Sequence, residues 1–187
     1  WTAVMTAARD VVDFWQKAGR EKWFAKDDAF DAAIRENFLD LHFKAARNEL
    51  SDWMETAGGA LALMILLDQF PRNLFRNSGH AFATDPLALS LAKQSIELGH
   101  DTATEPDLAG FFYLPFEHAE DLPEQERCIA LFTALTDRGG PKDYLDYAVI
   151  HRDVIARFGR FPHRNPALGR TTTADEQVFL NEGGFKG

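Results

Sequence analysis

The side chains best suited to chemistry gather near the C-terminal end of the chain, between residues 151 and 170. This segment contains His151-Arg152-Asp153 and Arg157-Phe158-Gly159-Arg160-Phe161-Pro162-His163-Arg164-Asn165-Pro166. It holds five arginines and one aspartate, in a chain whose formal net charge is −9. Like charges at this density repel one another unless anions compensate them. The sequence therefore predicts either that acidic groups of the same chain close over the segment or that the segment binds an anion.

A second cluster places carboxylates beside a histidine and consists of Glu117, His118, Glu120 and Asp121. Carboxylates this close together can raise one another's pKa. A histidine oriented by a carboxylate can act as a general acid or base. We take His118 as the candidate catalytic residue, with Glu117 as the carboxylate that orients it. His151 beside Asp153 is the other possible pair.

The acidic cluster could also bind a divalent metal. Glu117 and Asp121 would share one face of a helix, and His151 could complete the set of ligands. The spacing matches neither the His-Glu-x-x-His pair of zinc proteases nor the Glu-x-x-His motif of di-iron bundles. The sequence also has no Gly-rich phosphate loop, Gly-x-Ser-x-Gly elbow or Cys-x-x-Cys pair. We therefore predict no metal site and no cofactor.

Two similar stretches could bind an anionic ligand. Gln69-Phe70-Pro71-Arg72-Asn73 resembles Arg160-Phe161-Pro162-His163-Arg164-Asn165, and both stretches follow predicted helices. The similarity can come from turn formation alone, because Pro stops a helix and Asn tolerates turn geometry. Alternatively, two equivalent helix ends direct Arg72 and Arg164 toward one cavity. The candidate ligand-binding residues are Arg72, Asn73, His151, Arg152, Arg160, His163, Arg164 and Asn165.

A purely structural role can explain the same residues. Arginine binds a carboxylate through two parallel hydrogen bonds and tolerates burial when it is paired. The acidic cluster and the arginine-rich segment could then form an ion network that stabilises the fold modestly. Against this, the arginines and histidines exceed what four nearby acids would neutralise, which favours a pocket for phosphate, sulfate or carboxylate. Both interpretations stay open on the sequence alone.

Asp68 stands at the end of an otherwise apolar stretch. A charge in such a place is costly unless it is paired. Its natural partners are Arg72, four residues further on, or an arginine of the segment 151–170. We interpret Asp68 as a structural ion-pair residue rather than a catalytic one.

The elements that position these residues are predicted to be helices. Apolar residues recur at helical spacing, and no long stretch alternates as a half-buried strand would. A first helix carries Val4 and Trp15 and stops at Gly19. A second follows the acidic residues 27–31, which suit the positive end of a helix. Residues 60–70 are apolar on nearly every face, as in a central buried helix that Pro71 ends or kinks.

Helix start signals continue through the second half. Asp85 is predicted to cap a helix that has Pro86 at its first position and runs to Gly99. Further helices are expected over residues 123–135 and 141–159, and the sequence from Thr173 to Glu176 matches a capping box. We predict about seven or eight packed antiparallel helices in an all-α fold. No linker divides the chain, so residues 1–187 are expected to form one domain.

Composition restricts the class of function. The chain of 187 residues is 45% hydrophobic and 26% charged, which is typical of a soluble folded protein. Its acidic total argues against nucleic acid as a partner, because phosphate backbones need a sustained basic face. The longest apolar run is too short to span a bilayer, and the first residues lack the features of a signal peptide. The single Cys128 cannot form an internal disulfide, so we expect a cytoplasmic protein.

The order of several motifs resembles the domain of unknown function 924 family, an uncharacterised and mainly bacterial family. The resemblance covers nearly the whole chain. It rests on Val12-Asp13-Phe14-Trp15, Trp23-Phe24, Leu66-Leu67-Asp68-Gln69-Phe70-Pro71-Arg72-Asn73, Ala81-Phe82-Ala83-Thr84-Asp85-Pro86, Pro115-Phe116-Glu117-His118-Ala119-Glu120-Asp121 and Arg157-Phe158-Gly159-Arg160-Phe161-Pro162-His163-Arg164-Asn165. It implies a tetratricopeptide-like helical fold but no activity. A clear 34-residue repeat of the tetratricopeptide kind is not visible in the sequence.

Two functions remain open from the sequence. The first is binding of a small anion that bears phosphate or carboxylate, in a cavity lined by arginine and histidine, with acid or base chemistry by His118 and Glu117 if a reaction follows. The second is an interaction module whose stacked helices present a concave groove to a peptide or protein. A small-molecule site would be a closed polar pocket, whereas a peptide groove would be long and open. The sequence does not indicate an oligomeric state.

Overall fold

The computed structural model describes residues 2–187, with side chains from Ala8 onward. Trp1 and the side chain of Val4, which entered the sequence predictions, lie outside the described residues. Within this range the chain forms α-helices and short 3₁₀ and π segments, and no strand. The prediction of an all-α fold is therefore confirmed. The tetratricopeptide-like arrangement stays a prediction.

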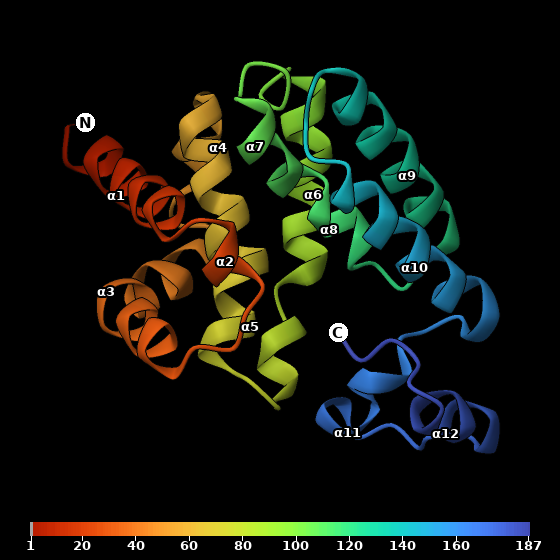
Figure 1. Ribbon diagram of the computed structural model, residues 1–187. Coiled ribbons are helices and arrows are strands. Elements are labelled where there is room, and N and C mark those ends of the chain that lie inside the picture. The colour runs from red at the N-terminus through yellow and green to blue at the C-terminus, as the bar shows by residue number, and fades with distance from the viewer. Residues whose placement is uncertain (1) are drawn as a thin grey trace.

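The first half of the described chain builds one side of the molecule (Figure 1). Its elements are α1 (Thr2–Ala18), α2 (Arg20–Trp23), α3 (Asp28–Ala46), η1 (Ser51–Glu55), α4 (Ala57–Met64), η2 (Ile65–Gln69), α5 (Phe70–Leu74) and η3 (Gly79–Phe82). α4 packs against α1 and continues through η2 into α5, which packs against α3. This half therefore surrounds one long, bent and largely buried helical segment.

The second half begins with α6 (Asp85–Glu97), which packs against α4. Its further elements are α7 (Pro106–Ala109), η4 (Gly110–Phe112), α8 (Leu114–Glu117), α9 (Leu122–Asp137), α10 (Asp143–Phe158), η5 (Pro162–Arg164), α11 (Asn165–Leu168) and α12 (Ala174–Asn181). α9 and α10 lie side by side, and the C-terminal segments gather beyond the end of α10 (Figure 1). Short helical turns raise the number of separate helical segments above the predicted seven or eight.

Most helix ends follow the signals in the sequence. Gly19 directly follows α1 and has a φ of 74°, a conformation that glycine adopts without strain. Asp27 caps α3 by accepting hydrogen bonds from the backbone N–H groups of Ala29 and Phe30, each 3.0 Å long. The capping box between Thr173 and Glu176 is present as predicted. Local side-chain chemistry therefore sets these boundaries.

One predicted helix cap is wrong, and the helix that would have placed Glu117 and Asp121 on one face does not form. Thr84, not Asp85, is the N-cap of α6, and Asp85 is its first residue. The Asp85 carboxylate does not cap the helix because it is held by Arg72. Likewise, no helix continues from Glu117 to Asp121: α8 ends at Glu117, and Asp121 caps α9 by accepting from the Glu124 N–H at 3.1 Å. Glu117 and Asp121 therefore do not share a helix face.

Pro71 neither ends the central helix nor interrupts its burial. The chain turns as a π-helix over Ile65–Gln69, where the Phe70 N–H donates to the Ile65 carbonyl five residues back, and then runs on to Leu74. Proline has no N–H to give to a carbonyl in the preceding turn. Side chains replace that donor: His42 Nδ1 lies 2.8 Å from the Leu66 carbonyl, and Thr84 Oγ1 donates to the Leu67 carbonyl at 2.5 Å. The π-turn therefore keeps its carbonyls satisfied inside the core.

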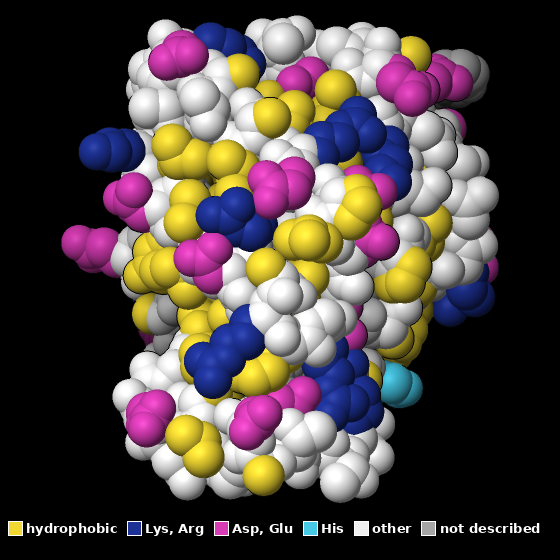
Figure 2. All heavy atoms as spheres, turned by 90° about the vertical axis from the view of Figure 1, so that its right-hand side faces the viewer, with side chains coloured by type: hydrophobic (Ala, Val, Ile, Leu, Met, Phe, Trp, Pro, Cys, Tyr) yellow, Lys and Arg dark blue, Asp and Glu magenta, His cyan; other side chains and the backbone are white. Residues whose placement is uncertain are grey.

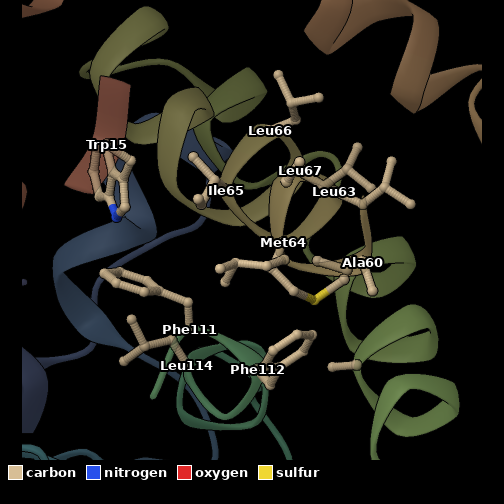
Figure 3. Close-up of a cluster of buried hydrophobic side chains, with 14 of the residues drawn as sticks. Trp15, Ala60, Leu63, Met64, Ile65, Leu66, Leu67, Phe111, Phe112 and Leu114 are labelled. Carbon is tan, nitrogen blue, oxygen red and sulfur yellow. The ribbon is translucent and has the colours of Figure 1, made fainter. Parts of the chain in front are cut away.

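Aromatic rings and branched aliphatic side chains pack around this central segment. Figure 3 shows Trp15 of α1 and Phe111 of η4 near Ile65, with Phe112 and Met64 on the adjoining side. All five of these side chains are almost completely buried. The continuity of this cluster from α1 to α10 explains why the apolar stretch at residues 60–70 has no polar face.

The C-terminal segment has a smaller apolar cluster of its own. Val154, Ile155 and Phe161 form its buried part, and Phe179 and Phe185 pack against them. This cluster joins the end of α10 to η5, α12 and the last residues. It therefore fixes the arginine-rich segment against the rest of the molecule.

The face of the molecule that contains α9 and α10 carries charges of both signs. Figure 2 shows basic, acidic and hydrophobic side chains interspersed over the face that contains α9 and α10. Among the described residues, no helix is both long enough and apolar enough to cross a membrane.

Replacing Phe70 by Ala should destabilise the protein by about 3–5 kcal/mol, because truncating a buried aromatic loses its transfer free energy and leaves a cavity. Phe70 is completely buried, and its ring contacts those of Trp15 and Phe38 at centroid distances of 5.6 and 5.2 Å. Urea denaturation provides the measurement. Phe24→Ala, at a side chain that is 57% exposed, is the control and should cost less than about 1 kcal/mol. Equal losses in the two variants would contradict this description of the core.

Candidate functional site

A cavity of about 900 Å³ lies between the two halves of the molecule. Its walls come from α2, the end of η2, α5, η3, α8, α10, η5 and the last residues of the chain (Figure 1). Many of the side chains that line it are charged or carry an imidazole, among them Arg72, Glu117, His118, His151, His163 and Arg164. The cavity therefore combines parts of both reactive clusters of the sequence.

Asp68 and His118 form a buried pair next to the cavity. Asp68 Oδ1 lies 2.7 Å from His118 Nδ1, and Asp68 Oδ2 accepts a hydrogen bond from Gln69 Nε2 at 2.7 Å. Burial alone would raise the pKa of Asp68, but the neighbouring His118 and Arg72 outweigh it and hold that pKa below its usual range. Asp68 is thus ionised, and its carboxylate can only accept. His118 therefore donates from Nδ1.

The second nitrogen of His118 is available for chemistry. Within the described residues, Nε2 of His118 makes no hydrogen bond, and the side chain lines the cavity. Burial, together with the charge of Arg72, lowers the pKa of His118 even though Asp68 acts in the opposite direction. The imidazole is therefore neutral near pH 7, and its Nε2 carries a free lone pair. This is the geometry of a general base held by a carboxylate.

Two arginines share one carboxylate at the cavity wall. Arg72 binds Asp85 through two parallel hydrogen bonds of 2.9 and 3.0 Å, and it also donates to the Asp68 carbonyl at 2.7 Å. Arg164 Nη1 stands 3.6 Å from the same Asp85, which is too far for a hydrogen bond. Asp85 and Asp68 raise the pKa of Arg72 in spite of its burial. Arg72 is therefore fully paired, and Arg164 is not.

Arg164 is held by aromatic rings instead. Its guanidinium carbon lies 4.5 Å from the ring centroids of both Phe82 and Phe161. Its Nε is buried and has no hydrogen-bond partner. Burial and the charge of Arg72 lower the pKa of Arg164 to about 10, so it still carries its charge at neutral pH. A buried cation with unused donors remains open to an anion.

Glu117 and His151 form a second carboxylate–imidazole contact. Glu117 Oε1 lies 3.4 Å from His151 Nδ1, which donates to the Tyr147 carbonyl at 2.8 Å. Burial and the nearby Asp68 raise the pKa of Glu117 to about 8, and burial lowers the pKa of His151 to about 3. Both groups are therefore mainly neutral at pH 7. Glu117 Oε2 is buried and has no hydrogen-bond partner.

The last residues of the described chain cover one side of the cavity. The Phe185 ring lies 4.4 Å from that of His151 and 5.4 Å from that of His163, measured between centroids. Burial and the charge of Arg164 lower the pKa of His163 to about 4. The histidines of this wall are therefore uncharged near neutral pH.

The structure brings five of the eight predicted ligand-binding residues to the cavity. Those that line it are Arg72, Asn73, His151, His163 and Arg164. Of these, Asn73 has its amide engaged, because Nδ2 donates to Asp31 at 2.8 Å. The two similar stretches of the sequence do direct one arginine each toward a common cavity.

The other three predicted residues do not line the cavity. Arg152 is on the surface and pairs with Glu126 and Asp153. Arg160 binds Glu176 through hydrogen bonds of 2.7 and 2.9 Å. Asn165 is buried, and its amide also donates to Glu176, at 3.1 Å. Arg152 and Arg160 therefore form ion pairs, but with acids outside the predicted acidic cluster.

Within the acidic cluster, Glu117 and His118 line the cavity, whereas Glu120 forms an ion pair outside its lining. Glu120 accepts two hydrogen bonds from Arg170, of 2.7 and 2.9 Å, and one from the Phe161 N–H at 2.8 Å. Glu117 does not orient His118: Asp68 holds that imidazole. The pairing was missed because 50 residues separate Asp68 from His118, and no local spacing connects them.

Two residues that contact Arg72 and Arg164 were not identified as part of this site from the sequence. Asp85 was interpreted as a helix cap, although its carboxylate joins two arginines. Phe82 was not singled out, although it contacts the guanidinium groups of both Arg72 and Arg164. Within the described residues, no three histidine, cysteine or acidic side chains are grouped so that they could hold a metal ion.

Similarity to other proteins covers nearly the entire chain. Residues 11–184 match the family described as bacterial protein of unknown function (DUF924). The solved structure of a protein of unknown function, ATU0120 from Agrobacterium tumefaciens, is 53% identical in sequence and has a TM-score of 0.91, with 96% of this chain and 99% of that chain covered. No functionally curated protein matches the chain. The resemblance inferred from the motifs is therefore confirmed, and the chain belongs to the DUF924 family.

Proposed function

We propose that this protein binds a small anion bearing a phosphate or carboxylate group in the cavity, with Arg164 as the main anchor. The observation that carries the proposal is that the buried guanidinium of Arg164 lacks a hydrogen-bonded partner. Its guanidinium is buried between Phe82 and Phe161, and within the described residues its side chain donates no hydrogen bond to any protein group. Arginine presents a planar fork of donors that matches phosphate and carboxylate.

The charges around Arg164 support this role. Asp85 is the only carboxylate within 4.0 Å of the guanidinium among the described residues, and Arg72 already binds it with two hydrogen bonds. Asp68 is engaged by His118 and Gln69. The charge of Arg164 is therefore only weakly compensated, because Asp85 is hydrogen-bonded to Arg72 and lies 3.6 Å from Arg164. An incoming anion would also give hydrogen-bond partners to donors that are costly to leave unused in a buried site.

We further propose that His118 acts as a general base if the bound anion undergoes a reaction, with Asp68 as the group that orients it. The supporting geometry is the 2.7 Å contact at Nδ1, which leaves Nε2 free on the cavity side. Glu117 would serve as a protonated acid, because its pKa is raised to about 8. A base and an acid held at different pKa values in one site are what general acid–base catalysis requires.

The cavity favours a small ligand over a peptide. The side chains of Arg164, Glu117 and His151 that line it are buried, which is typical of a pocket that selects a small polar ligand. We also propose a cytoplasmic location without nucleic acid as a partner. Cys128, the single cysteine, is completely buried, and its thiol contacts the Tyr113 carbonyl at 3.6 Å.

Inorganic phosphate, sulfate or acetate should raise the melting temperature of the wild-type protein at constant ionic strength. A ligand at a hundred times its Kd stabilises the folded state by about 2.7 kcal/mol, which corresponds to several degrees at this chain length. Thermal-shift titration provides the measurement. Arg164→Gln removes the charge and leaves a shorter polar amide, and it should abolish the shift. Arg152→Gln, the same exchange at a surface arginine of the same segment, should leave the shift intact.

Two outcomes would contradict the proposal. The first is a folded wild-type protein whose melting temperature none of these anions raises. The second is an equal shift in wild type and Arg164→Gln, which would place any binding elsewhere.

The free energy of unfolding of the wild type should fall by about 2 kcal/mol relative to that of Glu117→Gln as pH rises from 6.5 to 8, because unfolding of the wild type releases a proton from Glu117. The folded protein holds that proton up to about pH 8, whereas the unfolded chain releases it near the ordinary value of 4.5. His151 and His163, with pKa values lowered to about 3 and 4, act oppositely, as do His42 and His118, whose pKa values are also lowered. This histidine contribution is common to the wild type and the variant, so it cancels in the comparison. Urea denaturation at several pH values measures the effect.

The amide of Glu117→Gln cannot lose a proton, so the pH dependence of this variant contains only the histidine contribution. Glu120→Gln is the matched control: Arg170 lowers the pKa of Glu120 despite partial burial, so this variant should lose the same stability at pH 6.5 and at pH 8. The same pH dependence in the wild type and Glu117→Gln would show that Glu117 is already ionised at neutral pH.

His118 should be the neutral tautomer with its proton on Nδ1 at pH 7, and Asp68→Asn should weaken that preference, because a neutral amide no longer demands a donor. Long-range proton–nitrogen NMR correlations distinguish the tautomers. His42, whose Nδ1 faces the Leu66 carbonyl, is an internal control that should not change. A charged His118 at pH 7 would contradict its proposed role as a base.

A further inference from the structure

The volume of the cavity exceeds what its anion-binding end requires. A phosphate or carboxylate group fills only a small part of about 900 Å³, a volume at the upper end of pockets that hold whole organic molecules. A ligand that filled the site would therefore extend well beyond Arg164. The walls farther from Arg164 indicate what the rest of that ligand is.

Aromatic side chains from α2 and α10 line this remaining part. Phe24 is 57% exposed and Tyr147 is 55% exposed, yet both belong to the cavity wall. The rings of Phe24 and Tyr144 meet edge to face at a centroid distance of 6.2 Å. Aromatic surface left uncovered inside a concave site offers stacking partners to a planar ligand.

Helix α10 connects the two ends of the cavity. Tyr144, Tyr147 and His151 follow one another at spacings of three and four residues, so they lie along one face of the helix. Seven residues of α-helix span about 10 Å. Tyr144 marks the aromatic end, and His151 lies beside Glu117 near the charged end. A ligand that reaches both ends therefore needs a spacer of a few atoms between its ring and its acid group.

We propose that the ligand is an aromatic organic anion, in which a phosphate or carboxylate bound at Arg164 is joined by a short spacer to a planar ring that packs on Phe24 and Tyr147. This inference rests on the proposed anion site and names the class of molecule that fills it. The ring supplies the apolar contact area, and the acid group supplies the charge. Neither the ring nor the acid group alone would fill the cavity.

Isothermal titration calorimetry with matched probes tests the proposal. The phosphate probes are inorganic phosphate, propyl phosphate and 3-phenylpropyl phosphate, and the carboxylate probes are acetate, butanoate and 4-phenylbutanoate. The aryl probe of each series should bind at least tenfold more tightly than its alkyl counterpart. Phe24→Ala and Tyr147→Ala should each remove most of this gain and leave the affinity for inorganic phosphate unchanged.

Phe43→Ala is the control, because this partly exposed phenylalanine of α3 is not part of the cavity wall. It should keep the full preference for the aryl probes. Equal affinity for aryl and alkyl probes, with binding still lost in Arg164→Gln, would overturn this inference and leave the proposed anion site standing. An aryl preference that survives both Phe24→Ala and Tyr147→Ala would also overturn it. Absence of binding by every probe would overturn both.

Discussion

The burial of one carboxylate governs the arrangement of this protein's interior. Asp68 is fully buried within the central helical segment, and an ionised carboxylate is tolerated there only if donors surround it. His118, Gln69 and Arg72 provide that environment from three directions. Arg72 in turn is paired with Asp85 at the start of α6, and Asp85 stands 3.6 Å from Arg164. A chain of charge compensation thus runs from the core to the arginine-rich segment.

Two neighbouring carboxylates in this interior take opposite protonation states. Asp68 and Glu117 are both almost inaccessible to water, yet the pKa of Asp68 is lowered and that of Glu117 is raised to about 8. The difference lies in their partners. Asp68 accepts two short hydrogen bonds, whereas one oxygen of Glu117 has no partner and the other has only a long contact to His151. Hydrogen bonds and nearby charge, rather than depth of burial, therefore decide which acid keeps its proton.

The sequence predicted those features that depend on neighbours in the chain. Gly19, Asp27 and the Thr173–Glu176 capping box act within a few residues, so their patterns were sufficient. Features that depend on distant partners were missed or wrong. The sequence suggests Asp85 as a helix cap, but its carboxylate binds Arg72 instead. It also suggests Glu117 as the partner of His118, but the partner is Asp68. Arg152 and Arg164 look equivalent in the sequence, and only packing separates the surface arginine from the buried one.

The π-turn at Ile65–Gln69 makes the length of the central segment as important as its composition. Each residue of an α-helix turns the chain by about 100°, and a π-turn accommodates roughly one residue more than an α-helical turn. Deleting a single residue there would close the π-turn into an α-helical turn and change the backbone position from which Asp68 reaches His118. Inserting a further residue would rotate α4 relative to α5 by about that angle. Substitutions among the apolar residues of this segment change neither the length nor the turn. Length variation should therefore be far less tolerated here than in the connections between the outer helices.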